Sequence, residues 1–407
     1  MGGLDSIEMS VERPLDGVRV CDFSRILAGP YLALLLQDMG AEVIKVERAD
    51  RGDDTRTWSP ALARSGGGEP ISTYFAAVNR GKQSVAVDFR KPGARELTQR
   101  LAASCEIVVQ NFRPGVAADM GIDYAGLAPL NPQVVCCSIS GYGNAGELAD
   151  LPGTEIAIEG MSGLMAVTGP ADGEPARFGV ALIDITTGLT GAARTLGALL
   201  HARATGVGGQ VDVSLYGTAL GVLGTLIADY SSTGDEPRRW GSHHPSIVPY
   251  GGFPTADGHL ITGVLNDAMW VPLCEALEAP ELAAREEWRI MGNRVADRAE
   301  LEPLIAAATR RRTTAEWLDR LNERGLIGAP IRGVGEAVED PATQAMGLLV
   351  ALEGHAGVVA TRLDSVARPG STEHVPRLGE HTREVLRRVL GLGELELTAL
   401  AEAGVIS

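Results

Sequence analysis

Short apolar runs alternate with helical patterns along the first half of this 407-residue chain. The runs with the length and composition of buried strands are Val18–Phe23, Glu42–Glu47, Ser84–Asp88, Glu106–Gln110, Val134–Ile139 and Val211–Leu215. Helical spacing of apolar residues lies between them, for example in Pro30–Met39 and Gly93–Ser104. Because alternating strands and helices fold most simply into a parallel sheet covered by helices, the sequence predicts an α/β fold.

The first strand–helix–strand unit has the form of a nucleotide-binding unit without its glycine fingerprint. Its first turn, Ser24–Pro30, reads SRILAGP and contains no G-x-G-x-x-G. A dinucleotide pyrophosphate would therefore lack the close backbone approach that these glycines provide. The sequence predicts a Rossmann-like large domain that binds some other ligand.

The length and the composition along the chain predict two domains. A single core rarely serves 407 residues, and residues 233–247 (TGDEPRRWGSHHPSI) are polar and have no periodicity. We expect a large domain from 13–232, a linker at 233–249, a smaller α/β domain at 250–324, a second linker at 325–345, and a return to the large domain at 346–407.

Charge and cysteine content exclude several classes of protein. The net charge of −16 disfavours nucleic acid or an anionic membrane as the main partner. The five cysteines form no C-x-x-C pair, so we expect neither a disulfide framework nor a metal site. The N-terminal residues 1–12 have no apolar core and are expected to form a loose tail. A cytoplasmic protein fits these features best.

Several catalytic motifs are absent from the sequence. It contains no G-x-S-x-G and no H-E-x-x-H, and Gly81-Lys82-Gln83 lacks the earlier glycine and the following Ser or Thr of a P-loop. Serine hydrolases with a G-x-S-x-G motif, zincins with an H-E-x-x-H motif and P-loop NTPases are therefore disfavoured.

The stretch Ala176–Arg203 places one carboxylate between a predicted strand and a predicted helix. We expect a strand at Phe178–Ile183 and a long helix from Asp184, because apolar residues follow it at three- and four-residue spacing. A helix N-terminus favours an ionised aspartate, and strand ends of open α/β sheets bind ligands. Asp184 is therefore a candidate nucleophile, with a structural helix cap as the alternative reading.

Eight sequence blocks carry a resemblance to a known family. They are Pro14–Val20, Leu27–Pro30, Gly40–Glu47, Asn79–Lys82, Asn111–Gly115, Ser140–Gly143, His244–Tyr250 and Leu378–Thr382. In this order the blocks resemble the class III CoA-transferases, a group that includes formyl-CoA transferase, carnitine CoA-transferase and succinyl-CoA:dicarboxylate CoA-transferases. The resemblance extends over nearly the whole chain.

The resemblance implies a covalent mechanism at Asp184. The carboxylate attacks an acyl-CoA thioester to give a mixed anhydride, the CoA thiolate returns to form an aspartyl thioester, and a free carboxylic acid then takes the CoA. The resemblance implies no metal and no prosthetic group, with the CoA thioester as substrate. It also implies an interlocked homodimer.

The resemblance further implies a CoA site. Its residues are Arg25, Ile26, Leu27, Ala28, Arg48, Lys82, Asn111, Phe112 and Arg113. The segment 25–28 is expected near the thioester end and the others near the remainder of CoA, where cations suit the phosphates. Two positions depart from formyl-CoA transferase, because Arg25 replaces a histidine and Asp119 replaces an arginine.

The predicted strand end Gly141-Tyr142-Gly143 has two readings. Its backbone N–H groups could stabilise an oxyanion or contact substrate, or the segment could be a plain turn. The glycine-rich lid of formyl-CoA transferase has no counterpart beyond Gly251-Gly252.

Two other functions remain as alternatives. An α-methylacyl-CoA racemase needs a second base, but Thr154 stands at the position of its histidine, beside Glu155. A non-catalytic CoA-binding subunit would have no need of Asp184.

The expected substrates are dicarboxylic acids and their CoA esters, because Arg25 and Arg177 offer cations. The block Met161–Met165 also resembles the succinyl-CoA-dependent branch.

Overall fold

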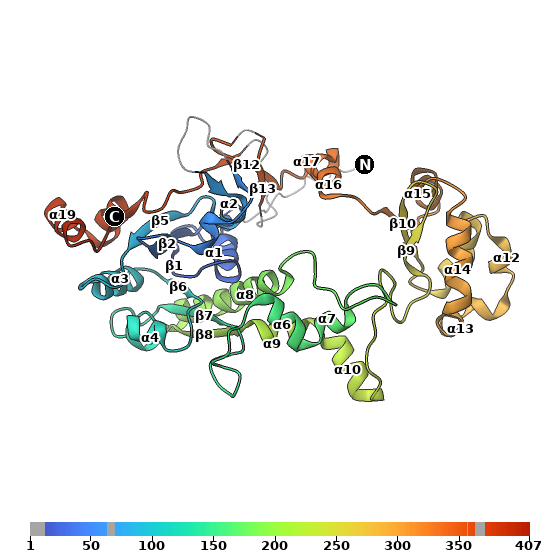
Figure 1. The fold of residues 1–407 in the computed structure, drawn as a ribbon, viewed down its shortest axis with the longest axis horizontal. Coiled ribbons are helices and arrows are strands. Elements are labelled where there is room, and N and C mark those ends of the chain that lie inside the picture. Colours follow the sequence, from blue (N-terminus) through green and yellow to red (C-terminus); the bar gives the residue numbers. More distant parts are fainter. Residues whose placement is uncertain (1–12, 63–69, 356, 363–370) are drawn as a thin grey trace, which may run out of the picture. The chain divides into compact units, whose positions relative to one another are not determined.

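The computed structural model describes residues 13–62, 70–355, 357–362 and 371–407, so the tail expected at 1–12 lies outside the described residues (Figure 1). The chain divides into two compact units. Unit 1 comprises the described parts of 1–162, 178–233 and 341–407, and unit 2 comprises 163–177 and 234–340. Residues 163–177, which the sequence assigned to the large domain, thus group with unit 2. So does the predicted linker 233–249, apart from its first residue.

A six-stranded parallel sheet forms the centre of unit 1. In spatial order its strands are β5 (Gln83–Val87), β2 (Glu42–Arg48), β1 (Arg19–Asp22), β6 (Ile107–Gln110), β7 (Val135–Ser140) and β8 (Gly209–Ser214). This is the 3-2-1-4-5-6 order of doubly wound folds, in which the direction of winding reverses between the first and fourth strands. The α/β prediction is confirmed, and the reversal lies between β1 and β6.

Helices cover the sheet, and the end of the chain returns to it (Figure 1). The main ones are α1 (Ala28–Asp38), α3 (Ala94–Ala103), α8 (Leu182–Thr205), α18 (Thr382–Leu390) and α19 (Glu394–Glu402). Val385 and Leu397 of the last two join the core formed by strand residues such as Ile44 and Val108. The C-terminal segment therefore completes the core of unit 1.

Helix α8 lies against α1 through glycines. A Cβ atom at Gly188 would be 2.8 Å from the carbonyl oxygen of Ala28, and one at Gly191 would be 2.7 Å from Leu32 Cδ1. Only a residue without a side chain allows this approach. The start of α1 is thereby fixed one helical turn from Asp184.

The strand predicted at Phe178–Ile183 does not form, because α8 already begins at Leu182. The N–H of Phe178 donates to the carboxylate of Glu159 at 3.2 Å instead of to a neighbouring strand. Two other helical segments are divided. Helices α6 (Glu155–Ser162) and α7 (Leu164–Val167) are separated at Gly163 with φ +93°, and α9 (Leu215–Val222) is followed by α10 (Gly224–Thr233).

Shorter elements complete unit 1. They are η1 (Asp54–Thr57), β3 (Ala61–Leu62), β4 (Ile71–Ser72), α2 (Thr73–Asn79), α4 (Val116–Met120), α5 (Tyr124–Leu127), α17 (Pro341–Ala345), β12 (Leu349–Leu352), β13 (Val359–Thr361) and β14 (Thr372–Glu373). Strands β13, β12 and β14 form a separate small sheet.

Unit 2 has its own antiparallel sheet and its own core. Its strands are β9 (Tyr250–Pro254), β10 (His259–Gly263) and β11 (Ile327–Pro330), with β10 in the middle. Its helices are α7, η2 (Asp267–Met269), α11 (Trp270–Ala276), α12 (Pro280–Ala283), η3 (Glu286–Arg289), α13 (Met291–Ala296), α14 (Arg298–Thr309), α15 (Thr314–Asn322) and α16 (Val334–Glu339). Three fully buried tryptophans, Trp270, Trp288 and Trp317, fill this core.

Among the described helices, none combines the length and the apolar character needed to cross a membrane.

Candidate active site

The loops that follow β1 and β6 meet at the reversal of the sheet. The Arg25 N–H donates to Asn111 Oδ1 at 2.9 Å, and Asn111 Nδ2 donates to the Arg25 carbonyl at 2.7 Å. Open α/β sheets bind their ligands in the crevice at this point, at the carboxyl ends of the strands. The structure thus brings together Arg25 and Asn111, which the sequence predicted for one site although they are far apart along the chain.

Two cations share one carboxylate beside this crevice. Arg25 Nη1 lies 3.2 Å from Asp54 Oδ2, and Arg48 Nη2 lies 2.8 Å from Asp54 Oδ1. All three side chains are partly exposed. A pair of accessible guanidinium groups suits phosphate or carboxylate, either of which could take the place of Asp54. Arg113, in the loop after β6, is exposed nearby in the chain.

Lys82 is buried and does not face solvent. Its Nζ donates to Asp22 at 2.9 Å, to the Pro30 carbonyl at 2.9 Å and to Asn79 Oδ1 at 3.1 Å. Burial lowers the pKa of Lys82 to about 8, even though Asp22 opposes this shift. The position argues against a direct contact between Lys82 and CoA, which the sequence had suggested. Instead, Lys82 supports the end of β1 through Asp22.

Asp184 lies in the first turn of α8 and does not cap it. The N-cap residue is Ala181, which makes no side-chain capping bond. Within the described part of the chain, no group donates a hydrogen bond to the Asp184 carboxylate. Burial raises its pKa to about 6, so desolvation outweighs the helix N-terminus that the sequence suggested would keep it ionised. An unbonded carboxylate of this kind is a stronger nucleophile than a solvated one.

The loop after β1 lies beside the first turn of α8. Leu27 packs in one apolar cluster with Ala181 and Ile185, on either side of Asp184, and with Tyr31 and Tyr74. The close approach of Gly188 to Ala28 continues this contact along α8. The predicted thioester-end residues Leu27 and Ala28 therefore lie beside the first turns of α8, the helix that carries the candidate nucleophile.

Two carboxyl groups of α6 lie near the start of α8, where Asp184 affects the pKa of one of them. The carboxyl groups of Glu155 and Glu159 lie one turn apart on α6, and the Oε1 atom of each is buried. Burial, then Glu159 and then Asp184 raise the pKa of Glu155 to about 7. One proton is therefore held beside the start of α8 near neutral pH. Sequence reasoning assigned no role to this pair, whose signal was the i,i+4 spacing of two glutamates in an otherwise apolar segment.

Comparison with known proteins places this geometry in a family. The profile described as CoA-transferase family III matches residues 15–382. The chain belongs to CoA-transferase family III. As the family description states, its activity is the transfer of CoA.

Named relatives match almost the full chain. The succinate–glutarate CoA-transferase of Agrobacterium fabrum is 38% identical over 92% of this chain and 95% of its own. The succinyl-CoA:glutarate CoA-transferase of Homo sapiens is 35% identical over 99% of this chain and 92% of its own. The crystal structure of a CaiB/BaiF family protein from Brucella suis is 36% identical and superposes with a TM-score of 0.81, covering 93% of this chain and 100% of that one.

In this CoA-transferase, the segment Gly141–Gly143 has the bonding of a turn. Gly143 has φ +101°, and its N–H donates to Ser140 Oγ at 3.0 Å. The Tyr142 hydroxyl lies 3.0 Å from Met161 Sδ. A Cβ atom at Gly141 would lie 2.5 Å from the Gly153 Cα. The N–H of Gly143 is thus occupied internally, which favours the turn over the oxyanion reading.

Phe112 and Arg177, which the sequence also predicted to contact substrate, lie in different units. The N–H of Phe112 donates to Gln110 Oε1 at 2.7 Å, and its ring packs against the core of unit 1. Arg177 belongs to unit 2. In the parts of the chain that the structure describes, no group of three or more His, Cys, Asp or Glu side chains could hold a metal.

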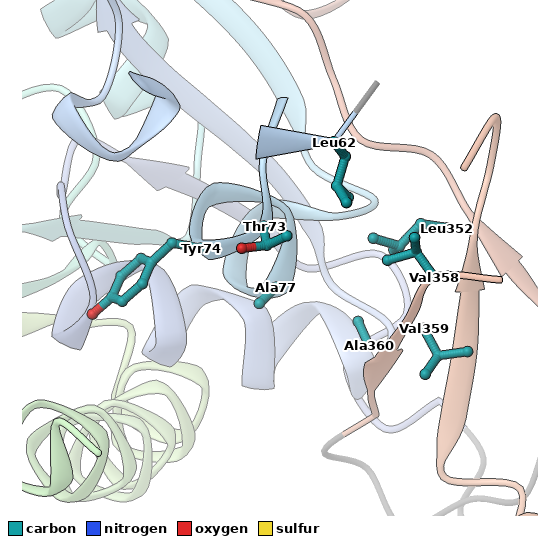
Figure 2. Close-up of a pocket in the computed structure, with 8 residues that line it drawn as sticks. All are labelled: Leu62, Thr73, Tyr74, Ala77, Leu352, Val358, Val359 and Ala360. Carbon is teal, nitrogen blue, oxygen red and sulfur yellow. The ribbon is translucent and has the colours of Figure 1, made fainter. Parts of the chain in front are cut away.

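A cavity of about 350 Å³ lies between α2 and the small sheet of β12 and β13 (Figure 2). Its lining is Leu62, Thr73, Tyr74, Ala77, Leu352, Val358, Val359 and Ala360. The ring of Tyr74 points away from the other seven residues (Figure 2). The lining carries no carboxylate and no cation, so this cavity is not the site of the acyl transfer.

Proposed function

We propose that this CoA-transferase moves CoA from succinyl-CoA to a second dicarboxylic acid through a covalent intermediate on Asp184. The observation that carries the proposal is the unbonded, partly buried carboxylate of Asp184 beside the loop after β1. The named relatives act on succinate and glutarate or on their CoA esters. Their high coverage of this chain supports the same class of substrate.

The proposed steps balance without a cofactor. Asp184 attacks the thioester carbonyl, the C–S bond breaks, and a mixed anhydride and CoA thiolate result. The thiolate then attacks the Asp184 carbonyl, which releases the first acid and leaves an aspartyl-CoA thioester. The acceptor carboxylate attacks that thioester, the C–S bond breaks, and a second anhydride forms with release of the CoA thiolate. Finally, the thiolate attacks the acceptor's carbonyl, which yields the new acyl-CoA and restores Asp184.

Arg25 and Arg48 supply the positive charge that the substrates need. Their shared partner Asp54 leaves one net positive charge among the three side chains. CoA carries several phosphate charges, and a dicarboxylate substrate has a distal carboxylate as well. We propose that Arg48 binds CoA and that Arg25, at the loop beside Asp184, contributes to the preference for a second carboxylate.

The proposed assembly is an interlocked homodimer in the cytoplasm. The chain passes between the two units at 162–163, 177–178, 233–234 and 340–341, so each subunit has several connections around which a second copy could thread. The five cysteines are free and buried, as expected in a reducing compartment.

Two measurements test the proposed function. After incubation with succinyl-CoA, hydroxylamine should convert the acylated Asp184 into a hydroxamate that peptide mass spectrometry locates. In turnover assays, succinyl-CoA should exceed butyryl-CoA as donor, and glutarate should exceed butyrate as acceptor. Modification at another residue would contradict the mechanism. Equal rates with the monocarboxylic compounds would contradict only the substrate class.

A further inference from the structure

The backbone of the loop after β1 is bonded almost entirely to side chains. The Ser24 N–H donates to Asp22 Oδ1 at 2.9 Å, and the Ser24 carbonyl accepts from Lys45 Nζ at 3.0 Å. Backbone groups in a loop usually bond to water or to other backbone groups. Here two charged and buried side chains fix the first residue of the loop.

The next two residues are held in the same way. Asn111 bonds to both the N–H and the carbonyl of Arg25, and the Ile26 N–H donates to Asp53 Oδ2 at 3.2 Å. Asn111 comes from the loop after β6, on the other side of the sheet reversal. The loop is therefore bonded from three directions: the end of β1, β2 with its following loop, and the loop after β6.

Ile26 is held in a conformation that it would not adopt freely. Its φ is +71°, in the left-handed region, which is a genuine outlier for a β-branched residue. Its side chain is 38% exposed, so core packing does not account for the conformation. Such outliers persist only where the surrounding bonds over-determine the backbone, and they cluster at ligand sites.

The charged groups that hold the loop are buried, and removing a charge from water costs free energy. Lys45 Nζ lies 3.0 Å from Asp53 Oδ2, and both side chains have no exposed surface. Burial alone would lower the pKa of Lys45, but the carboxylates of Asp53, Asp22 and Glu47 raise it above its ordinary value. An apolar pair of similar volume would often stabilise a fold as well or better. Stability alone therefore does not require this buried ion pair.

We infer that Asp22, Lys45, Asp53 and Asn111 are positioning residues that form a clamp on the Ser24–Ile26 backbone and preset it for acyl-CoA beside Asp184. The inference rests on the proposed function, because Leu27, directly after the clamped segment, belongs to the apolar cluster against which Ala181 and Ile185 of the α8 start are packed. A preset loop loses less conformational entropy on binding and holds the thioester in line with the nucleophile.

Asn111→Ala tests the clamp with a matched control. Asn131 makes the same kind of contact before β7: its Nδ2 donates to the Ala103 and Cys105 carbonyls at 3.1 and 3.0 Å, and its Oδ1 accepts from the Gln133 N–H. Asn111→Ala and Asn131→Ala should lower Tm by similar amounts. Only Asn111→Ala should lower kcat/KM for succinyl-CoA, by roughly 10–100-fold. Equal kcat/KM in the two variants would overturn the inference.

A second substitution separates positioning from direct contact with CoA. Ile26→Asn should fold, because asparagine adopts the left-handed region readily and the residue is partly exposed. Its own kcat/KM, whatever its value, is the reference for the double variant. If Asn111 acts by holding the loop, its removal should cost at least threefold less in kcat/KM in the Ile26→Asn background than in the wild type. The same loss in both backgrounds would mean that Asn111 contacts the substrate, which would also overturn the inference.

Hydrogen exchange keeps the test independent of the enzymatic assay. Amides 24–26 should exchange at least tenfold faster in Asn111→Ala than in wild type, and should be unchanged in Asn131→Ala. Absence of CoA transfer in the wild-type protein, with this exchange pattern intact, would contradict the proposed function and leave the clamp standing. Unchanged exchange in Asn111→Ala would contradict the clamp alone.

Discussion

The carboxylate of Asp184 combines two opposing influences. The N-terminus of α8 favours its charge, whereas removal from water disfavours it, and burial prevails and raises its pKa to about 6. At neutral pH the group is therefore mostly ionised but poorly solvated. The same desolvation also destabilises the folded state whenever the group is charged.

Asp184→Asn should abolish turnover and stabilise the protein. Loss of a covalent nucleophile should reduce kcat by about 10⁴-fold or more. The folded-state pKa lies above the unfolded value of about 3.9, so the stability linked to this group is present at low pH and is lost as the pH rises through about 6. The variant should accordingly have a higher Tm than wild type at pH 7.5, but not at pH 4. Asp319 is exposed on unit 2, so Asp319→Asn serves as the control and should change neither kcat nor Tm.

The rate should follow the ionisation of Asp184. Because only the carboxylate attacks the thioester, kcat/KM should fall about tenfold per pH unit below about 6 and level off above it. A pH profile from 5 to 8.5, with circular dichroism confirming that the fold persists, measures this. A rate that is constant down to pH 5 would show that desolvation does not control the nucleophile.

The shared partner of Arg25 and Arg48 predicts two effects of opposite sign. Arg48→Ala should raise KM for succinyl-CoA by about tenfold, because a charge-assisted hydrogen bond contributes roughly 1.5–3 kcal/mol. Asp54→Asn should lower KM a few-fold, since it removes the carboxylate that competes with substrate for both cations. Both effects should shrink at high salt. A higher KM in Asp54→Asn would mean that Asp54 instead orients the arginines.

At the scale of elements, the contact between α1 and α8 depends on glycine. Gly188→Ala would drive a Cβ atom to 2.8 Å from the Ala28 carbonyl, whereas Gly197, on the same helix, has no atom of the described residues within 4 Å of such a Cβ. Gly188→Ala should destabilise unit 1 by about 1–3 kcal/mol, and Gly197→Ala should stabilise it by about 0.5–1 kcal/mol through helix propensity. Urea denaturation of both variants measures the difference. Equal effects would show that α8 can move away from α1.

At the scale of the whole molecule, the homodimer stays a prediction. Helix α10 has no buried residue in the described chain, and its Ile227 and Tyr230 are 42% and 50% exposed. If a second copy covers this helix, Ile227→Lys should lower the sedimentation coefficient at micromolar concentration relative to the wild-type dimer. Leu395→Lys, at an 89% exposed position of α19, is the control. A monomeric and active wild-type protein would contradict the dimer.

Unit 1 also depends on residues from both ends of the sequence. The core around β1 and β2 includes Val385 and Leu397, and Val87 forms a bridge with Ile406. The two passages through unit 2 separate these parts in the chain. The fold of unit 1 is therefore complete only after the last helix has docked.

Local sequence was sufficient to predict the sheet and the family. Hydrophobic runs such as Val18–Phe23 and Glu42–Glu47 located strands of the sheet, because buried parallel strands are continuous and apolar. Sequence blocks such as Leu27–Pro30, Asn111–Gly115 and His244–Tyr250 identified the family. The prediction of a strand at Phe178–Ile183 was wrong, because an apolar run looks the same in a strand as in an extended segment that leads into a helix.

Only the tertiary structure decided how these residues are used. The sequence predicted Lys82 for the CoA site, yet the fold buries it against Asp22. Lys45, within a strand, gives no hint in the sequence that it bonds to the Ser24 carbonyl. The pKa of Asp184 and the pairing of Glu155 with Glu159 likewise depend on which elements exclude water. Residue type and order determine the strands, the helices and the family. Burial and long-range contacts determine charge, access and backbone conformation, and these exist only once the chain has folded.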